Sequence, residues 1–166
     1  MKLNMRRPLA ELLKQYNACQ GGAAWAKQFR SASAAWEACV NPEWMLWALD
    51  KIGYSDQSNL RLCACEFVRE TPLTDGRKVW DLLTDERSRN AIEVAERFAA
   101  GKAGEDELAA AWTAAWAWAA WAAARTAGAA AWAAARAAQC KIIRRIIGNP
   151  FRPKKRVKVN PKGGNP

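Results

Sequence analysis

The sequence predicts an all-α protein, a single helical domain around a long Ala/Trp-rich C-terminal helix, followed by a basic extended tail. Three observations lead to this prediction. Residues 109–138 consist mostly of alanine with interspersed tryptophans, and alanine has the highest helix propensity of all residues. Elsewhere, apolar residues recur at helical spacing between glycines, prolines and capping residues. No run alternates apolar and polar residues with β-branched enrichment, so no strand is predicted.

The first helix is expected over Pro8–Ala18, where apolar residues follow helical spacing. Gly21 and Gly22 are expected to end it, because glycine interrupts helices. A short helical turn is expected over residues 34–39. Asn41 then caps a further helix that has proline at its first position and stops at Gly53.

The sequence of the middle of the chain predicts three more helical segments. Ser55 or Asp56 caps a helix that runs to the break at residues 71–72. Residues 77–83 form a short piece after the turn at residues 75–76. Thr84 caps a charged helix over Asp85–Ala99, which ends at a glycine.

The long C-terminal helix is expected from about Glu105 to Ile147, because acidic residues at its start and basic residues at its end complement the helix dipole. At 100° per residue, Trp112 and Trp116 share one stripe of this helix. The roughly opposite stripe, which is the candidate partner-binding surface, carries Trp118, Trp121, Arg125, Trp132 and Arg136. Each tryptophan offers a large apolar area, so both stripes are expected to pack against other parts of the chain or against a partner.

Charge divides the chain into a helical domain at 1–150 and a basic tail at 151–166 that contains proline and glycine. The net charge is +10, and it comes mostly from residues after 140, which include no acidic residue. Such a stretch can bind phosphate backbones through counterion release, or it can act as a solubilising extension. The candidate nucleic-acid-binding residues are Arg144, Arg145, Arg152, Lys154, Lys155, Arg156, Lys158 and Lys162.

The chain contains no histidine, which excludes Ser-His and Cys-His nucleophiles and Cys/His zinc sites. Cys63 and Cys65 would point about 200° apart on a helix, so they are poorly placed to share a metal. Five cysteines without a disulfide-framework spacing indicate buried free thiols and a cytoplasmic, reducing location. We therefore expect no catalytic residues, no metal and no cofactor. The uncharged stretch at 109–124 is too short for a membrane span.

Four segments carry a resemblance to a known family. They are AAWEACVNPEWMLWAL (34–49), LRLCACEFVR (60–69), LLTDERSRNAIEVAERFAAG (82–101) and the closing IIGNPFRP (146–153). In this order, and with an alanine-rich helix between the last two, they resemble bacterial immunity protein families. The resemblance implies an all-α, non-enzymatic protein that binds and neutralises a partner protein, such as a toxin. A defence complex is the partner expected for the alternative function given below.

Two functions are therefore expected from the sequence. The leading one is an immunity-like inhibitor that sequesters a partner protein. The alternative is a nucleic-acid-binding or phage-encoded anti-defence protein that acts through the basic tail.

Overall fold

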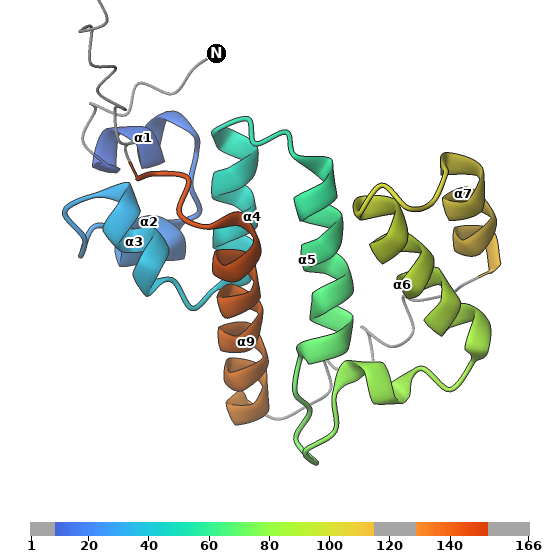
Figure 1. Ribbon diagram of the computed structural model, residues 1–166. Helices are drawn as coiled ribbons and strands as arrows, with labels where there is room; N and C mark the ends of the chain where they lie inside the picture. The colour runs from blue at the N-terminus through green and yellow to red at the C-terminus, as the bar shows by residue number, and fades with distance from the viewer. Residues whose placement is uncertain (1–8, 115–128, 153–166) are drawn as a thin grey trace, which may run out of the picture.

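The computed structural model describes residues 9–114 and 129–152, and within them the protein is all-α (Figure 1). The described part contains no strand, and an isolated antiparallel bridge joins Pro72 to Lys78. The helices are α1 (Leu9–Gln15), α2 (Gln20–Ala26), α3 (Ala32–Ala38), α4 (Pro42–Lys51), α5 (Gln57–Glu70), α6 (Glu86–Ala99), α7 (Glu105–Ala114) and α9 (Ala129–Ile147), with a 3-10 turn, η1, at Val79–Leu82.

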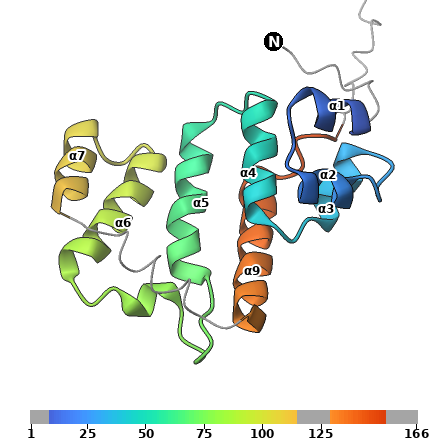
Figure 2. The same ribbon diagram turned by 180° about the vertical axis from the view of Figure 1, so that it is seen from behind.

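The longer helices form a row that is seen from both sides in Figures 1 and 2. Helix α5 packs against α6 on one side and against α9 on the other. Helix α7 covers the free side of α6, and α4 packs on α9. The short helices α1, α2 and α3 gather beside α4 at the end of the row opposite α7. None of the described helices has the combination of length and apolar character needed to cross a bilayer.

Helices α7 and α9 lie on opposite sides of α5 and α6 (Figure 1). The expected long helix from about Glu105 to Ile147 is confirmed in part: α9 forms its C-terminal portion, Ala129–Ile147, whereas α7 packs on α6, and residues 115–128 lie outside the described residues. A straight helix of that extent would measure about 65 Å at 1.5 Å per residue. Two separate helices instead bring both apolar ends onto one body, with Leu108 against α6 and Ile143 in the core beside α4.

Helix α5 divides the core into two clusters. Cys63 packs in the first cluster with Met45, Leu49 and Ile143, between α4, α5 and α9. Cys65 packs in the second with Val79, Leu83, Ile92 and Ala95, between α5, η1 and α6. The two thiols thus point to different sides of the same helix, as their spacing predicted.

Local capping signals place most of the helix ends. The Asn41 side chain accepts a hydrogen bond from the Glu43 amide at 3.0 Å, and the Asp56 carboxylate accepts one from the Asn59 amide at 3.0 Å. Gly53, with φ +69°, ends α4 as expected.

The predicted end of the first helix is wrong. Helix α1 ends at Gln15, and the residue that turns the chain is Asn17, with φ 52°. Asparagine adopts this left-handed conformation more easily than most residues. Gly21 and Gly22 lie inside α2 instead.

Candidate functional site

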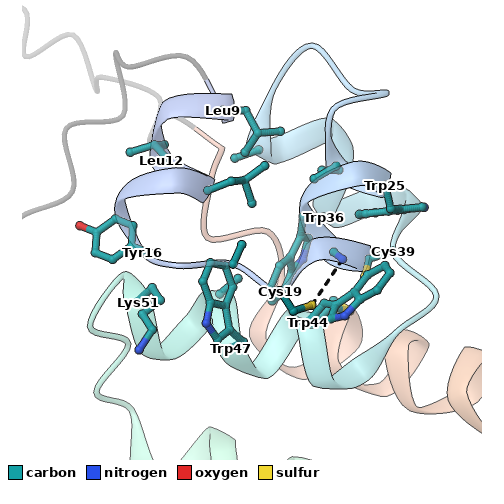
Figure 3. A pocket seen from close by; sticks show the side chains of 18 of the residues that line it. Leu9, Leu12, Tyr16, Cys19, Trp25, Trp36, Cys39, Trp44, Trp47 and Lys51 are labelled. Carbon is teal, nitrogen blue, oxygen red and sulfur yellow. Dashed lines mark hydrogen bonds between the residues drawn. The ribbon is translucent and has the colours of Figure 1, made fainter.

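A cavity of about 470 Å³ opens between the short helices α1–α3 and helix α4 (Figure 3). Its walls are mostly apolar. Leu9 and Leu12 extend into it from α1, while Trp44 and Trp47 rise from α4 on the other side. Ligand pockets in proteins are typically 300–1,000 Å³ and mostly apolar. The cavity therefore has the size and the chemistry of a binding site.

One face of α4 forms the floor of the cavity. Trp44, Trp47, Ala48 and Lys51 all line it, and positions i, i+3, i+4 and i+7 share one face of a helix. Asn41 fixes the start of this helix by capping it. The cavity face is thus set by local sequence, and both tryptophans are only half-buried.

Helix α2 approaches this floor closely because of its glycines. A Cβ atom on Gly22 would lie 3.4 Å from Cε2 and Nε1 of Trp44 and 3.2 Å from the Cys19 sulfur. The Gly22 amide donates a hydrogen bond to that sulfur at 3.4 Å, shown dashed in Figure 3. Glycine in α2 is therefore explained by close packing against Trp44, and not by helix termination.

Aromatic rings join α2 to α4 at the side of the cavity. The ring centroids of Trp25 and Trp44 are 5.4 Å apart at 42°, and Trp25 also contacts Phe29 at 4.7 Å. Tilted pairs at these distances add stability beyond their buried area. These ring contacts hold the side wall against α4.

Trp36 of α3 forms the inner wall and is 3% exposed. Its indole Nε1 donates to the Gly148 carbonyl at 2.9 Å, and its ring meets Phe151 edge-on at 5.7 Å. The Asn149 side chain donates to the Ser33 carbonyl and hydroxyl oxygens at 3.2 and 3.0 Å. Residues 148–152 therefore belong to the folded body, although the sequence places the start of the tail at residue 151.

Cys39 also lines the inner wall, at the junction of α3 and α4. Its side chain packs in the same core cluster as Cys140 of α9. Hydrogen bonding by the Cys140 side chain, together with the positive charges of Arg144 and Arg136, lowers the pKa of Cys39 to about 7. The same hydrogen bond raises the pKa of Cys140, and burial adds to this effect.

Few charged groups border the cavity. Glu43 is exposed, and Lys51 pairs with Asp50 at 2.7 Å. Among the described residues, no three Cys, Asp or Glu side chains gather closely enough to hold a metal ion. Apolar walls with a sparse polar border are suited to binding apolar groups.

The structure accounts for part of the predicted tryptophan stripe. Trp132 and Arg136 lie on α9 and are partly buried. The other members, Trp118, Trp121 and Arg125, lie outside the described residues.

The structure also assigns three of the candidate nucleic-acid-binding residues to contacts within the body. Arg144 is the clearest correction, because its guanidinium Nη1 donates to the carbonyls of Trp36 at 3.1 Å and Cys39 at 2.9 Å. It is a structural tie between α9 and the end of α3. Arg145 pairs with Glu66 at 2.7 Å, and Arg152 pairs with Glu37 at 2.8 Å, both at the surface. The remaining candidates, Lys154, Lys155, Arg156, Lys158 and Lys162, lie outside the described residues.

Sequence reasoning missed the four tryptophans that define the cavity: Trp25, Trp36, Trp44 and Trp47. A signal was present, since four of the ten tryptophans of the chain fall within residues 25–47. Their convergence depends on how three short helices pack, which helical periodicity does not report.

No family model, curated protein or solved structure matches the chain.

Proposed function

We propose that the protein is a non-enzymatic binding protein that holds a partner protein through the cavity between α1–α3 and α4, as an immunity-like inhibitor would. The occupant of the cavity is an apolar anchor of the partner, presented on one face of an amphipathic helix. The observation that carries this proposal is the pair of half-buried tryptophans, Trp44 and Trp47, on the cavity face of α4.

Three properties of the cavity support a protein partner. Tryptophan is enriched among the residues that dominate binding energy at protein interfaces. Helical partners commonly place their apolar face into such grooves through residues at i, i+3, i+4 and i+7. Three of the four floor residues, Trp44, Trp47 and Ala48, are apolar, so the apolar side chains of a partner helix can pack on them. The resemblance of the sequence to immunity protein families points to the same class of partner.

The test uses displayed 18-residue helical peptides that carry leucine at i, i+3, i+4 and i+7 and glutamate on the opposite face, selected on the full chain. Selected peptides are labelled with fluorescein and titrated by anisotropy. Trp47→Ala should weaken binding by about tenfold or more, which corresponds to about 1.4 kcal/mol. Leu46→Ala is the matched control, because Leu46 is on the same helix, is 38% exposed and does not line the cavity.

Circular dichroism is used to check that both variants fold. Peptides that bind the two variants and the original protein equally would contradict the proposal, as would a selection that yields no binder. Decanoic acid is titrated in parallel. If it binds in the cavity more tightly than every selected peptide, the site takes small apolar molecules and the proposed protein partner is wrong.

A further inference from the structure

Two buried thiols meet behind the inner wall of the cavity. Cys39 ends α3 and is 3% exposed, and Cys140 lies in the middle of α9 and is fully buried. They belong to the same buried core cluster, which also contains Trp36, Met45 and Ile143. The Cys39 thiol also donates to the Asn41 carbonyl at 3.3 Å. Two cysteines 101 positions apart in the chain thus pack in one cluster of the core.

One face of α9 fixes this meeting. Arg136, Cys140 and Arg144 follow one another at intervals of four residues, so they share a face of the helix. Arg144 holds the backbone carbonyl of Cys39 at 2.9 Å, one helical turn beyond Cys140. The end of α3 is therefore tied to α9 beside the two sulfur atoms, and the two arginines surround them with positive charge. Such surroundings favour the thiolate, which is the reactive form of cysteine.

The two thiols differ in access. Cys39 lines the cavity, so a small molecule that enters from solvent reaches its sulfur first. Cys140 is 0% exposed and lies behind it. Cys63 also packs in this cluster, but burial raises its pKa to about 11, so it stays protonated near neutral pH.

We propose that Cys39 and Cys140 form a redox-active pair in which hydrogen peroxide oxidises Cys39 through the cavity and Cys140 then closes an intramolecular disulfide. This modification site is independent of the proposed partner. It joins the end of α3 to α9 by a covalent bond directly behind the cavity wall.

Two steps complete the reaction. The Cys39 thiolate attacks one peroxide oxygen, the O–O bond breaks, and hydroxide leaves, which gives a sulfenic acid on Cys39. The Cys140 sulfur then attacks the Cys39 sulfur, the S–O bond breaks, and a second hydroxide leaves and takes up the Cys140 proton. The two thiols lose two electrons in total, and the peroxide gains them and ends as two molecules of water. Dithiothreitol reverses the product by thiol–disulfide exchange.

The test treats the folded protein with hydrogen peroxide, blocks the remaining thiols and digests it with trypsin without reductant. Trypsin places Cys39 on residues 31–51, Cys140 on residues 137–141, Cys19 on residues 15–27, and both cysteines of α5 on residues 62–69. We expect a linked pair of peptides 31–51 and 137–141 that separates on reduction. A link from 31–51 to 15–27 would show that Cys19, which also lines the cavity, is the partner of Cys39 and would overturn the proposal.

Two variants assign the roles within the pair. In Cys140→Ser, peroxide should leave the sulfenic acid on Cys39, and dimedone should label peptide 31–51. In Cys39→Ser, dimedone should leave peptide 137–141 unlabelled. Cys63→Ser is the matched control from the same cluster and should form the disulfide as the original protein does.

Because the linked peptide is read in the original protein, a variant that fails to fold does not remove the test. Absence of the 31–51 to 137–141 link in the folded protein would contradict the proposal. So would a link that forms only in urea, since that would assign it to the unfolded chain.

Discussion

At the scale of single residues, Gly22 shows how closely two helices approach at the cavity. Alanine at an exposed position inside a helix gains up to about 1 kcal/mol over glycine. We expect this gain for Gly21→Ala, whose Cβ would lie 3.9 Å from Trp44, an ordinary contact distance. Gly22→Ala should lose the gain, because its Cβ would crowd both the Cys19 sulfur and the Trp44 ring.

Urea unfolding followed by tryptophan fluorescence compares the two variants. Gly22→Ala should also bind the selected helical peptides less well, since Trp44 must move to make room. If both variants gain stability equally, the close approach of α2 to α4 is not what requires glycine.

Cys63 makes the free energy of unfolding decrease as the pH rises above about 9. Burial, helped by the negative charge of Glu66, raises the pKa of this thiol from about 9 to about 11, although Arg145 opposes the shift. Because the folded pKa lies above the unfolded one, the contribution is fully present below pH 9 and is lost as the pH rises toward 11.

We therefore expect the free energy of unfolding to fall between pH 8.5 and 10.5 by about 1–2 kcal/mol more in the original protein than in Cys63→Ala. Urea titrations at the two pH values measure the difference. An equal fall in both proteins would mean that Cys63 does not titrate differently in the folded and unfolded chains.

Residues that act on their own backbone are the ones that the sequence predicts best. Asn41, Asp56 and Gly53 cap or end helices through atoms two or three positions away, so their roles can be read without knowing the fold. Gly22 and Arg144 look locally like a helix breaker and a surface cation, respectively. Both act on residues that are distant in the chain, and only the packed structure shows this.

At the scale of elements, the tie between α3 and α9 depends on Arg144. Its guanidinium satisfies two carbonyls at the end of α3, and a hydrogen bond to a charged group contributes about 1.5–3 kcal/mol. Arg144→Met should therefore lower the free energy of unfolding by about 2–3 kcal/mol. The neighbouring variant Arg145→Met removes only the exposed pair with Glu66 and should cost at most about 1 kcal/mol.

Chemical denaturation of both variants measures this contrast. Equal losses would show that Arg144 contributes no more than a surface ion pair.

Helix assignment from the sequence succeeded for most of these elements, because apolar spacing and caps are local. Helix partners were not predicted, as the separation of α7 from α9 shows. An alanine-rich sequence can form one long helix or two shorter ones. Which of the two forms depends on the apolar surfaces that receive it, and here α7 packs on α6 while α9 packs on α4 and α5.

At the scale of the whole molecule, the remaining question is whether the cations after residue 153 act on nucleic acid. Deleting Lys154–Pro166 removes five of them: Lys154, Lys155, Arg156, Lys158 and Lys162. The thermal unfolding temperature should stay unchanged, because the contacts of residues 148–152 with α3 remain. A protein that binds through the cavity should keep its peptide affinity within a few-fold.

Titration of a labelled single-stranded oligonucleotide over a range of salt concentrations separates the two functions. Tail binding predicts an affinity that falls log-linearly with salt in the full chain and a much smaller slope after deletion. An oligonucleotide affinity with the same slope in both proteins would rule out the tail as the binding element.

The contacts between α3 and residues 148–152 also bear on how the protein emerges from the ribosome. The indole of Trp36 and its acceptor on Gly148 are 112 positions apart. At synthesis rates of about 5–20 residues per second, the indole waits roughly 6–22 s for that acceptor. During this interval the wall that Phe151 will cover faces water or a chaperone. Synonymous codons that slow translation between α4 and α9 should therefore increase aggregation of the newly made chain without changing the finished protein.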